Sequence, residues 1–297
     1  MLSKYNIVYK TVGGLDLCLD LHLPDNAENV AVVLWLHGPG GAMAGRRDDM
    51  PPHVRASVDK YRHALITADY RFAPQVGVPE IFEDVKACIK FIRSPTGLKI
   101  NALNTSRLAV AGNSAGGYLA LLAGLYVEPK PQCVLAMYPI TDPFGTCFID
   151  ALCVPEGRAR VDDASVHDIL FSNAVVANSA PTSARSMLFH HSIDNSHHSL
   201  FPEHMGLYIG QDALHYEGND YWRIAKSIEV NWLPPTFIWH GTGDTVVEVG
   251  QSDEVVGAMV GEETQFVYKR YPGRGHLFDM DRGIHMVPFY DFLGVHL

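Results

Sequence analysis

Apolar runs recur along the chain, and several of the segments between them have helical spacing. The runs are continuous rather than alternating, which is typical of parallel strands buried on both faces. They cover Val30–Leu36, Ala64–Ala68, 108–111, Cys133–Met137 and 236–239. Apolar spacing predicts a helix over Val78–Arg93, and the nearly all-apolar segment 118–125 predicts a central, buried helix. This alternation predicts an α/β fold with a mostly parallel central sheet flanked by helices.

The first residues have a different pattern. Segments 6–11 and Leu15–Leu23 are strand-like and are separated by Val12-Gly13-Gly14. The first half of the second segment alternates apolar and acidic residues, as in a strand with one face in water. We therefore expect a β-hairpin ahead of the parallel strands.

A long segment, 145–232, interrupts the alternation. It lies between two predicted strands and far exceeds the few residues of an ordinary connection. Ser165-Val-His-Asp168 resembles a capping box, and a second helix can begin after Pro181. We expect an inserted helical lid over the carboxyl edge of the sheet, where such sheets bind ligands, with 1–144 and 233–297 forming the core. The alternative is an insertion away from the chemistry.

A serine lies where strand 108–111 leads into the apolar helix. The segment Gly112-Asn-Ser-Ala-Gly116 has the pattern G-x-S-x-G. A serine on a sharp turn at a strand end projects its oxygen into the site, and small neighbours permit the turn. The amide of the next residue, at the positive end of the helix, faces a developing oxyanion. We predict Ser114 as the nucleophile and Ala115 as an oxyanion donor.

A base and an acid follow two later strands. Asp244 ends the motif His240-Gly-Thr-Gly-Asp244 after strand 236–239, and His276 follows the strand-like run Phe266–Tyr271. The order Ser114, Asp244, His276 is that of the α/β-hydrolases. His276 would take the serine proton and return it to the leaving group, while Asp244 would fix the tautomer of the histidine. The alternative is a turn aspartate beside one of many histidines.

A glycine-rich loop, His37-Gly-Pro-Gly-Gly41, comes directly after Val30–Leu36. Backbone N–H groups of such a loop can reach an oxyanion, and the alternative is a tight turn. We add Gly40 and Gly41 to the expected oxyanion hole. The candidate substrate-binding residues are His37, Asn113 and Phe144.

Further motifs accompany these residues in a fixed order. They are Asp69-Tyr-Arg-Phe-Ala-Pro74, Pro79 with Glu83-Asp84, Tyr138-Pro-Ile-Thr-Asp142 and Leu233-Pro-Pro. Together with the loop, serine and histidine motifs, they make the chain similar to the hormone-sensitive-lipase-like esterases of the α/β-hydrolase fold, over about residues 16–145 and 230–292. The 69–74 element makes the resemblance specific and supports the oxyanion loop in that family. The resemblance implies a cofactor-free serine esterase for carboxylic esters of small or medium-sized substrates.

Three departures from that family's pattern bear on the chemistry. Pro39 stands where the family usually has glycine, and proline has no N–H to donate. Asn113 stands where the family often has aspartate. Almost nothing precedes the hairpin, so the N-terminal helices that form part of the lid in many relatives are missing. We expect a more open site, or one covered only by 145–232.

Composition argues against several other classes. The 297 residues include 23 Lys and Arg against 33 Asp and Glu, a formal charge of −10 with no basic cluster, which excludes nucleic acid as an expected partner. No apolar run approaches the ~18 residues of a membrane span, and the start lacks the core of a signal peptide, so we expect a cytoplasmic protein. No zinc-type histidine or cysteine pattern occurs, so we expect no metal. A homodimer would use an edge strand or the last strand–helix unit.

Three functional hypotheses remain at this point. The first is a serine hydrolase that cleaves carboxylic esters through an acyl-enzyme. The second is an amide or formamide hydrolase, or a biosynthetic enzyme of secondary metabolism performing lactone hydrolysis, acyl transfer, elimination or cyclisation with the same residues, and Pro39 keeps it open. The third is a non-catalytic binding protein on a hydrolase scaffold.

Overall fold

The computed structural model describes residues 2–38, 44–143, 161–180, 183–188, 191 and 219–297. Its centre is an eight-stranded sheet in the order β1-β2-β4-β3-β5-β6-β7-β8. The strands are β1 (Leu2–Val12), β2 (Leu15–Leu23), β3 (Val30–Leu36), β4 (Ala64–Ala68), β5 (Leu103–Asn113), β6 (Cys133–Met137), β7 (Thr236–Gly241) and β8 (Phe266–Tyr271). Strands β3 to β8 are parallel to their neighbours among themselves, whereas β2 is antiparallel to β1 and β4.

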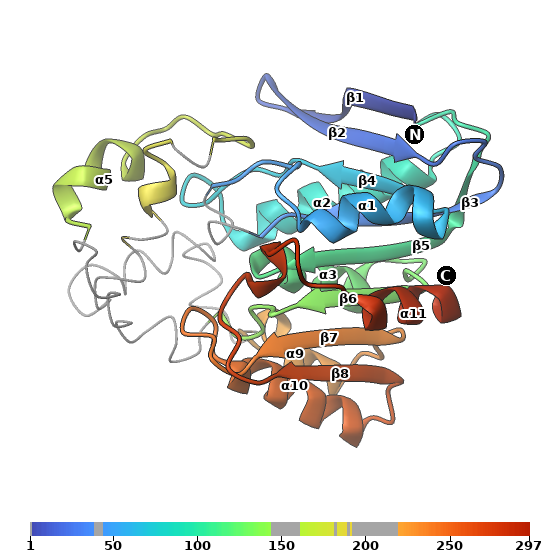
Figure 1. Ribbon diagram of the computed structural model, residues 1–297. Helices are drawn as coiled ribbons and strands as arrows, with labels where there is room; N and C mark the ends of the chain where they lie inside the picture. Colours follow the sequence, from blue (N-terminus) through green and yellow to red (C-terminus); the bar gives the residue numbers. More distant parts are fainter. Residues whose placement is uncertain (1, 39–43, 144–160, 181–182, 189–190, 192–218) are drawn as a thin grey trace.

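Helices cover both faces of this sheet. The described helices are α1 (Pro52–Tyr61), α2 (Val78–Arg93), α3 (Ala115–Tyr126), α5 (Asp163–Leu170), α9 (Ile224–Ile228), α10 (Val249–Gly261), α11 (Val287–His296) and the 3-10 helices η1 (Asn219–Trp222) and η2 (Phe278–Met280). Figure 1 shows α1 and α11 in front of the sheet and α2, α3, α9 and α10 behind it. The prediction of an α/β fold with a mostly parallel sheet flanked by helices is confirmed.

Each central strand contributes to two hydrophobic cores, because successive side chains of a strand point to opposite faces. Val32 and Leu34 of β3 face the core that α2, α3, α9 and α10 cover, whereas Val33 and Trp35 face the core under α1 and α11. All of β3 is buried, which is why its sequence is a continuous apolar run. The two-sided burial fixes the strand ends that carry the candidate site residues.

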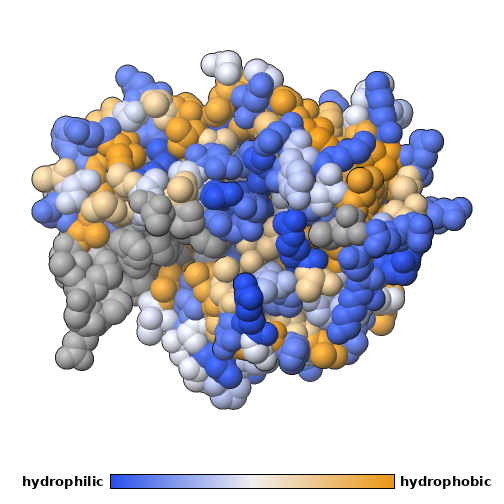
Figure 2. All heavy atoms as spheres, turned by 45° about the horizontal axis from the view of Figure 1, so that its top comes forward, coloured by the Kyte–Doolittle hydropathy of each residue, from blue (hydrophilic) through white to orange (hydrophobic). Residues whose placement is uncertain are grey.

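The predicted N-terminal hairpin is confirmed as β1 and β2. Gly13 and Gly14 form its turn with φ of +58° and +84°, a conformation that favours glycine. β1 is an edge strand, and it exposes Leu2, Tyr5 and Val8. Figure 2 shows apolar side chains interspersed with polar ones on the face where the top of Figure 1 comes forward. The predicted homodimer through an edge strand stays a prediction.

The described part of the insertion lies beyond the carboxyl ends of the parallel strands (Figure 1). Its backbone meets the loops after β3 and β4, with Ser179 N donating to Gly45 O at 2.9 Å and Phe72 N donating to Val176 O at 2.9 Å. Gln75 adds a side-chain hydrogen bond to Ile169 O at 2.9 Å. Much of the predicted lid, 145–160, 189–190 and 192–218, lies outside the described residues, so its covering role stays a prediction.

The predicted capping box at Ser165 is wrong. α5 begins at Asp163, and Asp162 is its N-cap. The Asp162 carboxylate accepts hydrogen bonds from Ser165 N at 2.8 Å and from Ser165 Oγ at 2.6 Å. Ser165 therefore occupies the N3 position, and its hydroxyl serves the cap instead of forming one. After Pro181, residues 186–188 are helical.

Candidate active site

Ser114 sits on a tight turn between β5 and α3, with φ of 53° and ψ of −121°. A non-glycine residue at positive φ costs of order 1–3 kcal/mol and persists where its surroundings enforce it. Here the backbones of β3, β5 and α3 approach closely. A Cβ on Gly116 would lie 2.0 Å from Leu36 O, and a Cβ on Gly112 would lie 2.4 Å from the carbonyl carbon of Gly116. Both flanking glycines are thus required for the turn that presents Ser114.

Three predicted side chains meet at the carboxyl ends of β5, β7 and β8. His276 Nε2 lies 3.1 Å from Ser114 Oγ, and His276 Nδ1 lies 2.7 Å from Asp244 Oδ2. An ionised carboxylate can only accept, so Nδ1 carries the hydrogen. Nε2 is then free to accept the Ser114 hydroxyl hydrogen. The chain of hydrogen bonds is therefore arranged for proton transfer from the serine to the histidine.

Asp244 is held by donors on both carboxylate oxygens. Oδ1 accepts from Val246 N at 2.9 Å and from Val247 N at 3.0 Å, while Oδ2 faces His276 Nδ1 and, at 3.3 Å, His240 Nε2. Burial alone would raise the pKa of Asp244, but the hydrogen bonds from His240 and His276 outweigh it and hold the pKa well below its usual range. Asp244 therefore stays ionised wherever the fold is intact at ordinary pH.

The predicted oxyanion hole lies partly outside the described residues. Pro39, Gly40 and Gly41 fall there, and so does the predicted pocket residue Phe144. Ala115 is the first residue of α3, so its N–H has no partner within the helix. Gly38, the last described residue of the loop, passes so close to the nucleophile turn that a Cβ would lie 1.5 Å from Asn113 O. The loop after β3 thus begins in direct contact with the residue before Ser114.

His37 is fully buried and packs as an aromatic ring. It stacks on Tyr70 with ring centroids 4.4 Å apart, and its ring meets Phe72 at 5.7 Å in an edge-on contact. The Tyr70 hydroxyl also donates to His37 O. Burial lowers the pKa of His37 to about 3, so the ring is neutral near pH 7. The 69–74 motif therefore supports the start of the glycine-rich loop through two of its aromatic rings.

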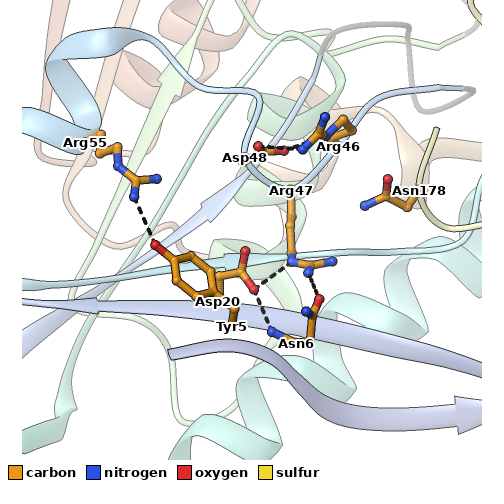
Figure 3. Close-up of a pocket in the computed structure, with 8 residues that line it drawn as sticks. All are labelled: Tyr5, Asn6, Asp20, Arg46, Arg47, Asp48, Arg55 and Asn178. Atoms are coloured by element: carbon orange, nitrogen blue, oxygen red, sulfur yellow. Dashed lines mark hydrogen bonds and ion pairs between the residues drawn. The ribbon is translucent and has the colours of Figure 1, made fainter. Parts of the chain in front are cut away.

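Arg47 anchors the far end of the same loop, as Figure 3 shows. Its Nε lies 3.0 Å from Asp20 Oδ1 of β2, its Nη1 donates to Asp69 Oδ2 at 2.5 Å, and its Nη2 donates to Asn6 Oδ1. These residues line a cavity of about 480 Å³, in which Arg46 pairs with Asp48 at 2.8 Å. The cavity's most buried cation is thus committed to holding the chain between the hairpin and the 69–74 motif.

Sequence reasoning missed a buried polar network behind the site. Tyr138 Oη donates to Asp279 Oδ1 at 2.5 Å and accepts from Asn113 Nδ2 at 3.2 Å, and His53 Nε2 lies 3.4 Å from Asp279 Oδ2. The Tyr138 ring also contacts His276, with centroids 4.8 Å apart. Asn113, predicted to bind substrate, is fully buried in this network. Tyr138 lies in a recognised motif, but nothing local in the sequence marks Asp279 as its partner.

The sheet order, the nucleophile turn and the strand-end position of the site define an α/β hydrolase. The match to the BD-FAE family model covers residues 19–259, and the chain belongs to that family. An α/β-hydrolase superfamily protein from Enterococcus faecalis has the same fold, with a TM-score of 0.72 and 18% identity over 99% of this chain and 97% of that one. Esterase 2 of Thermogutta terrifontis, solved with propionate, has a TM-score of 0.64 and 17% identity over 99% and 91% of the two chains.

Curated relatives are much longer proteins or match in part. The non-reducing polyketide synthase ausA of Penicillium brasilianum is 24% identical over 94% of this chain and 13% of the synthase. The chain spans between 12 and 16% of the length of the polyketide synthases it matches. Neutral cholesterol ester hydrolase 1 of Rattus norvegicus is 30% identical over 36% of this chain and 28% of that enzyme.

Two searches of the described residues were negative. No helix there is long and apolar enough to cross a membrane. In the same ranges, no group of three or more His, Cys, Asp or Glu residues is arranged to hold a metal ion. The predicted cytoplasmic location stays a prediction.

Proposed function

We propose that this protein is a serine hydrolase that cleaves a carboxylic ester of a small or medium-sized substrate. The observation that carries the proposal is the hydrogen-bonded chain from Ser114 through His276 to Asp244, at 3.1 and 2.7 Å. An esterase needs a nucleophile, a base within hydrogen-bond reach and a group that orients the base. The BD-FAE family match and the esterases among the structural neighbours support this class.

The proposed reaction proceeds in two halves. Ser114 Oγ attacks the ester carbonyl while His276 Nε2 takes its proton, and the histidine then protonates the departing alcohol. Water attacks the resulting acyl-enzyme with His276 again as the base. Asp244 keeps the hydrogen on Nδ1 and stabilises the imidazolium, which its lowered pKa permits over the whole working pH range.

The proposed oxyanion hole uses backbone N–H groups of Ala115 and Gly40, with Gly41 as a further donor. Removing a donor from a site built around it costs about 10²–10³ in rate, so the substitution of glycine by Pro39 calls for another N–H in its stead. Because their side chains are fully buried, His37 and Asn113 are proposed to shape the site from behind. Phe144 is the proposed contact for the acyl group.

A turnover assay tests this proposal. We expect p-nitrophenyl butyrate to be hydrolysed by the wild type and at least ~10³-fold more slowly by Ser114→Ala. Ser57→Ala is the matched control, because Ser57 is equally buried but contacts His63 and Val54 instead of the site. Equal turnover by wild type and Ser114→Ala contradicts the proposal.

A second candidate is hydrolysis or transfer of a polyketide acyl group. The observation that favours it is the similarity to polyketide synthases over 92–100% of this chain. The same acyl-enzyme would form from an aromatic thioester and be released to water or to an alcohol. We compare kcat/KM for a benzoyl thioester and for p-nitrophenyl butyrate. A preference for the thioester, or acyl transfer to added alcohol, favours this candidate.

A further inference from the structure

His240 is a buried histidine that the proposed reaction does not yet use. It is the fifth residue of β7 and is completely shielded from solvent. Its Nε2 lies 2.9 Å from Val247 O and 3.3 Å from Asp244 Oδ2, and its Nδ1 lies 2.7 Å from Ser252 Oγ of α10. Both ring nitrogens are therefore engaged, one of them with the carboxylate that orients His276.

The partners of His240 fix the position of its ring hydrogen. A backbone carbonyl and a carboxylate are acceptors only, so the hydrogen must be on Nε2, between Val247 O and Asp244 Oδ2. Nδ1 of the neutral ring is then an acceptor, and the Ser252 hydroxyl donates to it. Ser252 is also fully buried. The result is a directed chain of hydrogen bonds from Ser252 through His240 to Asp244.

We propose that His240 is a positioning residue that tunes the basicity of His276 through Asp244, an inference that rests on the proposed function. The same carboxylate oxygen, Oδ2, accepts from both histidines. A donor at His240 draws electron density from Oδ2 and so weakens its hold on the His276 imidazolium. It also fixes the direction in which Oδ2 faces His276. Removing the donor should therefore raise the pKa of His276 and loosen its orientation.

The other groups around His276 do not change in this experiment. In the described part of the chain, the titratable groups that face it are Asp244 after β7 and Tyr138 after β6, and Asp279 of η2 bonds to Tyr138. Tyr138 also lies 6.5 Å from the His240 ring, centroid to centroid. Substitutions at 240 and 252 leave each of these side chains in the protein.

The test compares three variants at the two ends of the new chain. His240→Leu removes the donor, whereas His240→Gln keeps an N–H at nearly the position of Nε2. Ser252→Ala leaves His240 in place but removes the hydroxyl that fixes its tautomer. Ser252 makes no printed contact with Asp244, so any effect of this variant on His276 must pass through His240. His63→Gln, a change at another buried histidine remote from Asp244, is the matched control.

We measure the pH dependence of kcat/KM with p-nitrophenyl butyrate and titrate His276 directly by ¹⁵N NMR. For His240→Leu we expect kcat to fall about 10- to 100-fold with KM nearly unchanged, and the His276 titration to move to higher pH by about 0.5–1 unit. Ser252→Ala should shift it in the same direction by less. His240→Gln should recover most of kcat and the wild-type titration.

An unchanged His276 titration in both His240→Leu and Ser252→Ala overturns the proposal, as does an equal loss in His240→Leu and His240→Gln. If His240→Leu does not fold, Ser252→Ala and His240→Gln decide the question. The NMR titration needs no turnover. A wild type without esterase activity would therefore refute the proposed function while leaving the coupling between His240 and His276 measurable.

Discussion

Removing one hydroxyl from Tyr138 tests the buried network behind the site. In Tyr138→Phe the ring keeps its contact with His276, but Asp279 loses its 2.5 Å partner and retains only His53 at 3.4 Å. Asp279 is fully buried, so water cannot replace the hydroxyl. A hydrogen bond to a charged group contributes about 1.5–3 kcal/mol, and an orphaned buried acceptor adds to the loss. We expect the free energy of unfolding to fall by about 3 kcal/mol.

Urea unfolding followed by circular dichroism measures this loss. Tyr118→Phe is the matched control, because the Tyr118 hydroxyl donates to a neutral carbonyl, Trp222 O, at 2.8 Å and its removal should cost only about 1 kcal/mol. The double variant Tyr138→Phe/Asp279→Leu removes both partners and should recover much of the stability. Equal losses for Tyr138→Phe and Tyr118→Phe, or a double variant less stable than Tyr138→Phe, would refute the reasoning.

Two further predictions concern a buried histidine and a buried arginine. Burial lowers the pKa of His63 to about 4, below the ~6.5 of the unfolded chain, so acidification from pH 7 to 5 protonates mainly the unfolded state and removes about 2 kcal/mol of stability. His63→Gln, which cannot be protonated, should flatten the fall by that amount in urea titrations, and an unchanged slope contradicts this. Arg47→Met leaves Asp20 and Asp69 unpaired and should cost about 3 kcal/mol in unfolding free energy and at least ~10-fold in kcat; a loss below about 1 kcal/mol argues against the anchoring role.

The parallel strands could be predicted because two-sided burial leaves a plain signature. β3 is apolar at every position, and the motifs that follow β5, β7 and β8 had to meet because parallel strands end at one edge. Helix α1 was missed for the opposite reason. It buries only Val54, Ser57 and Val58, too few apolar residues for a recognisable helical stripe.

The polar interactions around the site were harder to foresee. Asp279 and Tyr138 are 141 residues apart, and neither position alone indicates the other. His240 looked like part of a turn motif, and only the approach of α10 brings Ser252 to its second nitrogen. At α5 two candidate caps stood three residues apart, and Asp162 prevails because one carboxylate accepts from both the amide and the hydroxyl of Ser165.

Covalent labelling tests most directly whether Ser114, His276 and Asp244 act together. The folded wild type is treated with a fluorophosphonate, digested, and its peptides are analysed by mass spectrometry. We predict a single adduct on Ser114, formed faster as the pH rises through the His276 titration, strongly slowed in His276→Gln and absent in Ser114→Ala. An adduct on another residue, or no adduct on the folded wild type, would contradict the account.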